Sequence, residues 1–81
     1  MLARIVRVEP QEDYKLLVTF TNGKKGIFDA EPYLQSGSVF TPLKNLSLFR
    51  SVRVNKESAT IEWPNGADLC PDCVYLETKF I

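Results

Sequence analysis

The sequence contains no histidine, and this absence narrows the chemistry that the protein can perform. Histidine is the side chain whose unperturbed pKa lies nearest neutrality, and it is also the commonest metal ligand. The sequence has no glycine-rich phosphate loop either, and 81 residues leave little chain to enclose a substrate cavity beside a core. We therefore expect a protein that is not an enzyme and that holds no cofactor.

A net charge is also absent. Ten basic and ten acidic residues give a formal net charge of +0, so the molecule lacks the positive field that draws proteins to nucleic acid or to anionic membranes. The basic residues are dispersed along the chain and mixed with acids, as Arg4, Arg7, Lys24 and Lys25 illustrate. We expect no direct binding of nucleic acid.

Long apolar runs are missing as well. No run approaches the roughly 20 residues that a membrane-spanning helix needs, and the sequence does not open with a signal-peptide pattern. Hydrophobic residues make up 44% and charged residues 25% of the chain, which is close to the globular average and argues against disorder. We expect one domain over residues 1–81, in the cytoplasm and without membrane contact.

Alternation of apolar and polar residues predicts a strand over residues 14–20. Its buried face should carry three apolar side chains, Leu16, Val18 and Phe20. Asn22-Gly23 follows, and this pair between two apolar runs is a strong signal for a tight hairpin because both residues tolerate positive φ. Residues 25–28 should therefore return antiparallel to the first strand.

Another short strand is expected over residues 4–8, which Glu9-Pro10 would end. Regular alternation places Ile5 on one face of this strand. Val6 and Val8 would then lie on the opposite face.

The pattern changes from strands to short helices in the middle of the chain. Residues 29–34 predict a short helix that residues 36–38, Ser-Gly-Ser, would end. In residues 39–49 the apolar side chains recur at mixed three-and-four spacing, which indicates one or two further short helices. We expect Thr41 to cap the first of these, with Pro42 as its first helical residue.

Residues 51–55 and 60–63 predict a second hairpin, because alternation returns on both sides of a polar turn. Trp63, the only tryptophan, should belong to the core. Pro64 should end its strand because proline brings no N–H to a ladder.

The chain should then turn at Asn65-Gly66 and cross the end of the sheet with residues 68–70. Pro71 suits the first turn of a short C-terminal helix, where Asp72 favours the positive helix start. Together these elements predict an α+β fold. We expect a small antiparallel β-sheet built from hairpins, with one or two short helices packed on one face and a short C-terminal helix.

Cys70 and Cys73 form a C-x-x-C motif at the predicted helix start, a setting in which disulfide oxidoreductases lower a thiol pKa. A zinc site would need Asp68, Asp72 or a second chain to complete its tetrahedron. We favour a structural interpretation, in which Cys70 is a cap or packing residue and Cys73 is a small buried side chain. A small thiol redox or metal-binding protein is the alternative hypothesis.

Carboxylates are close together in the same region. Asp68 and Asp72 lie four residues apart, and with Glu62 and Glu77 they resemble paired carboxylates for hydrolysis. A carboxylate at a turn or helix start more commonly accepts backbone N–H groups, so we predict turn and cap roles for these residues.

The order of these signals resembles a family of small bacterial proteins, domain of unknown function 2442, over nearly the whole chain. The resemblance rests on three stretches, DYKLLVTFTNGKKGIFDAEPYL, VFTPLKNLSLFRSVRV and TIEWPNGADLCPDCVY. Its most specific part is a W-P-N-G-x-D-L-x-P-[DE]-x-x-Y run, here Trp63, Pro64, Asn65, Gly66, Asp68, Leu69, Pro71, Asp72 and Tyr75. The resemblance implies an α+β domain with an antiparallel sheet.

Members of that family are similar to the N-terminal domain of a two-domain protein whose second half is a helix-turn-helix, a motif that this chain lacks. Stand-alone members are often encoded beside another small protein, which implies an arrangement like a toxin and antitoxin pair. The family does not point to C-x-x-C chemistry, and other members carry an apolar residue at the position of Cys73.

Our functional hypothesis is a non-enzymatic protein-interaction module, the antitoxin-like or regulatory member of a two-gene pair. It would bind a partner protein through an exposed sheet edge or through the surface around Trp63 to Asp72. That candidate surface comprises Trp63, Asn65, Asp68, Asp72 and Tyr75. The identity of the partner and the formation of homo-oligomers are left open by the sequence.

Overall fold

Two antiparallel sheets form the framework of the computed structural model, which describes residues 3–34 and 39–81. The larger sheet has the strand order β1-β2-β3-β7, with β1 Ile5–Pro10, β2 Lys15–Phe20, β3 Lys25–Asp29 and β7 Lys79–Phe80. The smaller sheet has the order β4-β5-β6, with β4 Arg53–Val54, β5 Ile61–Glu62 and β6 Asp68–Leu69. The expected α+β fold is confirmed, whereas the second sheet, β6 and β7 were not predicted.

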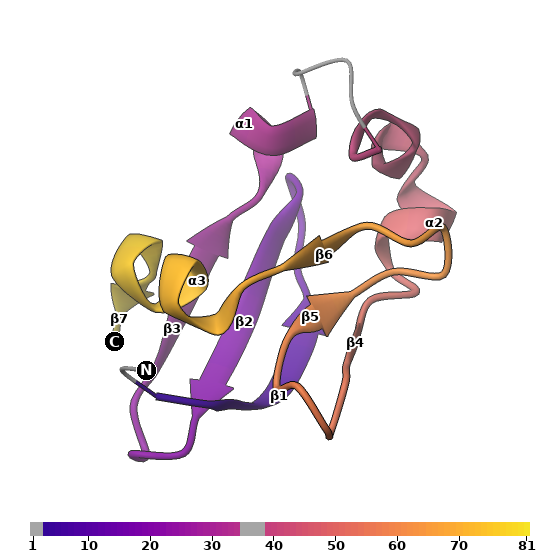
Figure 1. Ribbon diagram of the computed structural model, residues 1–81. Coiled ribbons are helices and arrows are strands. Elements are labelled where there is room, and N and C mark those ends of the chain that lie inside the picture. The colour runs from indigo at the N-terminus through magenta and orange to yellow at the C-terminus, as the bar shows by residue number, and fades with distance from the viewer. Residues whose placement is uncertain (1–2, 35–38) are drawn as a thin grey trace.

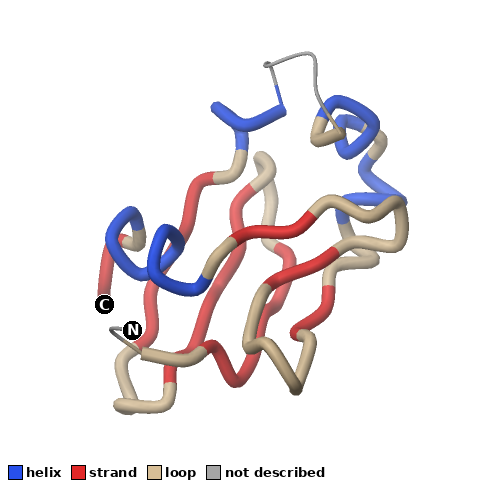
Figure 2. The backbone as a smooth tube through the Cα atoms, in the orientation of Figure 1, coloured by secondary structure: helices blue, strands red, loops and turns tan. Residues whose placement is uncertain are grey.

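Short helices connect these strands. They are α1 Glu31–Leu34, the 3-10 helix η1 Thr41–Lys44, α2 Leu46–Phe49 and α3 Pro71–Glu77. The smaller sheet and α3 lie in front of the larger sheet, and α1 follows the end of β3 (Figure 1). The tube in Figure 2 shows the same layering, with red strands behind and the blue turn of α3 before them. No helix in the described ranges is long and apolar enough to cross a membrane.

β2 is the centre of the larger sheet and follows the predicted alternation. Its inward side chains, Leu16, Val18 and Phe20, are at most 1% exposed. β3 returns antiparallel beside it, as expected, with Leu16 opposite Phe28. Because β2 has a neighbour on each side, its backbone groups are paired within the sheet. The burial of its inward side chains places its apolar face in the core.

The turn between β2 and β3 differs from the predicted type. Gly23 has a φ of +85°, but Asn22 has no positive φ. The Gly23 N–H donates to the Phe20 carbonyl at 3.0 Å, and the Phe20 N–H donates to the Lys24 carbonyl at 2.9 Å. This is a three-residue loop, in which a type I turn is followed by a left-handed glycine, rather than a two-residue turn.

β1 contains an irregularity that overturns the predicted faces. The pairing of β1 with β2 shifts between Ile5 and Arg7, so one extra residue is inserted there. As a result Ile5 is buried and Val8 also packs against the core, whereas Val6 is 55% exposed. The prediction that Ile5 faces away from Val8 was therefore wrong.

The helices after β3 begin as expected but are capped differently. The Asp29 carboxylate accepts the Glu31 N–H at 3.0 Å at the start of α1. Thr41 is itself the first residue of η1 and its hydroxyl, which is buried, has no hydrogen-bond partner, so the predicted cap was wrong. Asn45 instead caps α2 by accepting two backbone N–H groups. The predicted helix end at residues 36–38 lies outside the described residues.

Candidate interaction surface

Trp63 lies in the core and is only 3% exposed, which confirms the core prediction and removes it from the candidate surface. The indole Nε1 donates to the Phe49 carbonyl oxygen at 2.9 Å. The indole also packs against Phe49 and Phe40, with ring centroids 6.0 and 6.3 Å away. A partner therefore cannot reach this side chain without unfolding the region around it.

Asn65 is exposed and has a structural role in the turn after β5. Its Oδ1 accepts the Ala67 N–H at 3.2 Å, and its Nδ2 donates to the Val39 carbonyl at 2.9 Å. Gly66 takes a φ of +92°, and the Trp63 N–H donates to the Ala67 carbonyl. This turn repeats the geometry of the Asn22-Gly23 loop, and it leads into β6 instead of carrying the chain across the sheet end as predicted.

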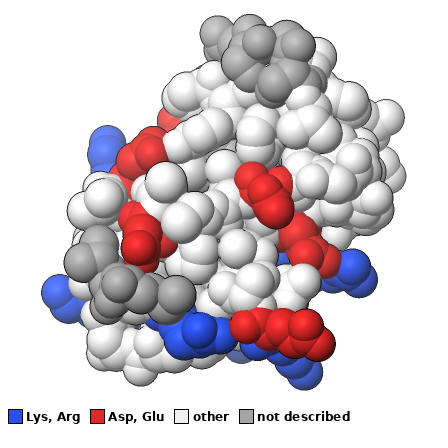
Figure 3. Space-filling model, in the orientation of Figure 1, with Lys and Arg blue, Asp and Glu red and all other residues white. Residues whose placement is uncertain are grey.

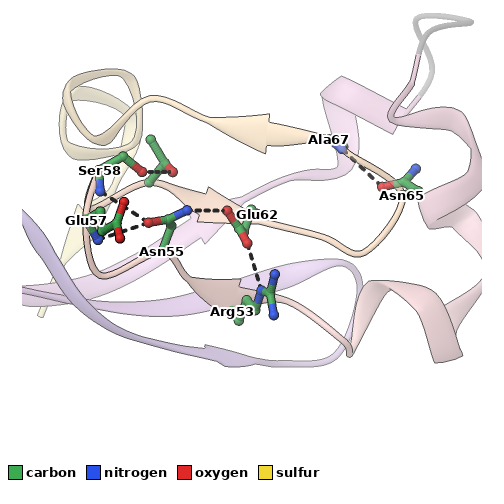
Figure 4. Close-up of polar contacts among 8 residues, drawn as sticks. Arg53, Asn55, Glu57, Ser58, Glu62, Asn65 and Ala67 are labelled. Atoms are coloured by element: carbon green, nitrogen blue, oxygen red, sulfur yellow. Dashed lines mark hydrogen bonds and ion pairs between the residues drawn. The ribbon is translucent and has the colours of Figure 1, made fainter.

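Asp68 is exposed on β6, directly opposite Glu62 on β5. Glu62 belongs to a polar network on the smaller sheet (Figure 4). It accepts hydrogen bonds from Asn55 Nδ2 at 2.9 Å and from Arg53 Nε at 2.7 Å. These bonds, first from Asn55 and then from Arg53, lower the pKa of Glu62. These hydrogen bonds join β4 to β5, which gives Glu62 a structural role.

Cys70 and Cys73 are both exposed free thiols at the start of α3. Cys70 is the N-cap residue and its side chain makes no cap hydrogen bond. The prediction that Cys73 is buried was wrong, because Pro71 and Val74 occupy the buried side of α3 and turn Cys73 outward. Desolvation, followed by the neighbouring Cys70, raises the pKa of the Cys73 thiol. In the residues described, no group of three or more possible ligands could hold a metal ion.

Tyr75 and Asp72 complete the predicted set. Asp72 is half-buried in the first turn of α3, as expected for an acidic residue at a helix start. Tyr75 is half-buried, and its ring packs edge-on against Phe20 with centroids 4.9 Å apart. Its hydroxyl accepts a hydrogen bond from Asn22 Nδ2 at 3.3 Å. Tyr75 thus joins α3 to the β2–β3 turn.

Three exposed apolar residues follow Tyr75 in the sequence. Leu76 is 73%, Phe80 41% and Ile81 80% exposed. The Phe80 ring lies 5.0 Å from the Tyr75 ring and 5.9 Å from the Phe20 ring. We use the name α3–β7 surface for four residues, Tyr75, Leu76, Phe80 and Ile81. Strand alternation places the Ile81 side chain on the face of β7 opposite to Phe80.

The predicted residues are therefore divided among three places: the core for Trp63, the β5–β6 hairpin for Asn65 and Asp68, and α3 for Asp72 and Tyr75. Only Tyr75 belongs to the α3–β7 surface. Reasoning from sequence missed Leu76 and Phe80. The signal that could have found them is a group of large apolar residues outside the periodic positions of a predicted strand or helix.

Acidic and basic side chains are unevenly distributed on the face that carries the smaller sheet and α3. The face that carries the smaller sheet and α3 shows acidic side chains within it and basic side chains along its outline (Figure 3). Asp68 is one of the exposed acids of the smaller sheet. In the described ranges the ion pairs are Arg7 with Glu9 and Arg53 with Glu62.

A family model matches nearly all of the chain. The model is described as Protein of unknown function (DUF2442), and the match covers residues 5–80. Neither a curated protein nor a solved structure matches the chain.

Proposed function

This chain belongs to the DUF2442 family, and we propose that it is a non-enzymatic module that binds a partner protein through the α3–β7 surface. The observation that supports this proposal most strongly is the concentration of exposed apolar side chains there. Three of the six exposed large hydrophobic residues of the described chain, Leu76, Phe80 and Ile81, lie within residues 76–81.

The other three exposed apolar residues lie on separate elements. Val6 belongs to β1, Val39 precedes η1 and Leu46 begins α2. Scattered exposed apolar residues are normal in soluble proteins, whereas several on two adjoining elements indicate a candidate interaction site. A standard interface needs about 800 Å² per partner, and the total accessible surface of 4884 Å² is large enough to supply such an area.

Two observations favour this function over metal binding or catalysis. No group of three or more possible metal ligands lies among the described residues. A broad, open depression beside the β1–β2 loop also offers no nucleophile next to a base. Its charged lining residues are Glu12, Asp13, Lys15 and Arg50.

The finer proposal is a regulatory or antitoxin-like role within a two-gene pair, so that the partner is a second small protein. This setting is suggested by the family resemblance alone. Binding would then act by occupying a surface of the partner, since the α3–β7 surface carries apolar and backbone groups but no activated nucleophile.

Comparative capture tests the proposal. Tagged wild-type protein, a Leu76→Asp variant and a Leu46→Asp control would be expressed in the source cells and purified with their bound proteins. Both leucines are exposed helical residues, so the two variants have matched chemistry. We expect one protein to be retained by the wild type and by Leu46→Asp and lost from Leu76→Asp. Equal retention by all three, or loss from the control alone, would disprove the proposed surface.

A further inference from the structure

We propose that the partner segment bound at the α3–β7 surface is an extended, acidic stretch of protein that alternates carboxylate and apolar side chains and pairs with the open edge of β7. This inference rests on the proposed function and names the chemistry of its partner. It is supported by the free edge of the larger sheet, by the apolar side chains on that edge, and by the lysines that flank it.

The first support is the backbone geometry of β7. Among the described residues, β7 is the last strand of the larger sheet and pairs with β3 alone, where Phe80 lies opposite Gly26. The Ile81 N–H donates to the Lys25 carbonyl at 3.0 Å, so this pair is a hydrogen-bonded one. Because bonded and non-bonded pairs alternate in an antiparallel ladder, the N–H and C=O of Phe80 point away from β3. They are oriented to pair with an added strand.

The second support is an excess of lysine on both sides of this edge. Lys24, Lys25 and Lys79 are exposed. The Lys24 ammonium lies 5.5 Å from the centre of the Phe80 ring, on the side of the sheet where Phe80 lies. Lys79 lies opposite Ile27, and alternation places its side chain on the other side, with that of Lys25.

An added strand would therefore meet positive charge on both of its faces. Glu77 is the nearest acid in the sequence, and it is already engaged, because the Tyr33 hydroxyl donates to its Oε2 at 2.6 Å. Carboxylates on one face of the alternating segment would complement Lys25 and Lys79, and the apolar residues on its opposite face would cover Phe80.

A second copy of this chain fits the edge less well than an acidic partner does. A symmetric pairing of two β7 edges brings Lys24, Lys25 and Lys79 of both copies to one surface, where like charges oppose association. A lipid surface also binds lysines that surround apolar residues, but it has no peptide groups that could pair with the outward N–H and C=O of Phe80.

Peptide titration tests the chemistry of the segment. ¹⁵N-labelled protein would be titrated with an acetylated ten-residue peptide that alternates valine and glutamate, with the same peptide carrying lysine for glutamate, and with phosphatidylglycerol vesicles. We expect the glutamate peptide to shift the amide resonances of Phe80, Ile81 and Lys24, and to bind at least about tenfold more tightly than the lysine peptide. Equal binding of the two peptides, binding of neither, or broadening by vesicles alone would overturn the inference.

Charge reversal separates this inference from the proposed function. The variant Lys24→Glu, Lys25→Glu, Lys79→Glu would be compared with Lys44→Glu, Arg50→Glu, Lys56→Glu, which changes the net charge equally at other exposed positions. We expect the first variant alone to slow association with the captured partner about tenfold, and high salt to remove the difference. If Leu76→Asp abolishes capture while the first variant associates normally, the interaction surface stands and the acidic segment is disproved.

Discussion

Gly26 on β3 allows β7 to approach closely, and replacing it by alanine should release this strand from the sheet. A Cβ atom at Gly26 would lie 2.3 Å from the Lys79 carbonyl oxygen, 2.7 Å from the Phe80 Cα and 2.8 Å from the Lys79 carbonyl carbon. Ordinary contacts between carbon and oxygen are about 3.3–3.6 Å. All three neighbours are backbone atoms, so no rotamer change relieves the clash, and β7 has to move by about 1 Å.

The expected cost follows from what β7 contributes. Displacement weakens the hydrogen bond between the Ile81 N–H and the Lys25 carbonyl, which is worth about 1 kcal/mol. It also separates the Phe80 ring from the Phe20 and Tyr75 rings, at about 0.5–1.5 kcal/mol for each pair. Alanine also lowers the conformational entropy of the unfolded chain relative to glycine, and this offsets about 0.4–1 kcal/mol of the destabilisation. The net destabilisation should be about 1–3 kcal/mol.

Thermal unfolding and amide spectra measure this effect together. For a domain of this size each 1 kcal/mol lowers the melting midpoint by roughly 4–8 °C. Gly23→Ala is the matched control, because a Cβ there meets no atom within 4 Å and only the positive φ opposes it. We expect Gly26→Ala, and not Gly23→Ala, to shift the amide resonances of Phe80 and Ile81. An unchanged midpoint with unchanged β7 resonances in Gly26→Ala would refute this account of the edge.

Four further predictions concern the core, a turn, the thiols and a tyrosine. Trp63→Ala should lower the free energy of unfolding by roughly 3–5 kcal/mol in urea titrations, and blue-shifted indole emission should report the buried ring; an exposed emission maximum would contradict this. Gly23→Val should lower stability by roughly 1 kcal/mol or more, because a β-branched residue is strained at φ +85°, and an unchanged melting midpoint would argue against the turn. Replacing Cys70 and Cys73 by serine should leave the midpoint unchanged because both thiols are exposed, whereas stoichiometric zinc or a reversible disulfide in the wild type would oppose the non-redox assignment. Desolvation and the neighbouring Glu77 raise the pKa of Tyr33 to about 12, so the folded state keeps a proton that the unfolded state loses above about pH 10. Stability should therefore fall between roughly pH 10 and 12, and Tyr33→Phe should remove that part of the slope.

The strands that could be predicted from sequence are those whose two faces differ. In β2 the alternation of buried Leu16, Val18 and Phe20 with half-buried neighbours is regular, so one face could be assigned to the core. In β1 the residues Ile5 and Val6 are both apolar. Which of the two side chains is buried is decided by an irregularity in strand pairing that the local sequence does not encode.

β7 could not be predicted because its formation depends on distant residues. The strand has two exposed residues, and its position is fixed by pairing with β3 and by ring contacts between Phe80 and Phe20. The phase of α3 was equally ambiguous from sequence. Cys73, Val74 and Leu76 are all apolar, and the packing of Val74 inward decides that Cys73 and Leu76 face outward. Of the predicted surface residues, Trp63 lies in the core and only Tyr75 belongs to the α3–β7 surface.

Site-specific photo-crosslinking in living cells tests the central claim most directly. A photoreactive phenylalanine analogue would replace Leu76 in one strain and Leu46 in another, since both positions are exposed. We predict one discrete covalent adduct with a single partner protein from position 76, and none with that protein from position 46. The same adduct from position 46 with none from position 76 would show that the partner binds a surface other than α3–β7.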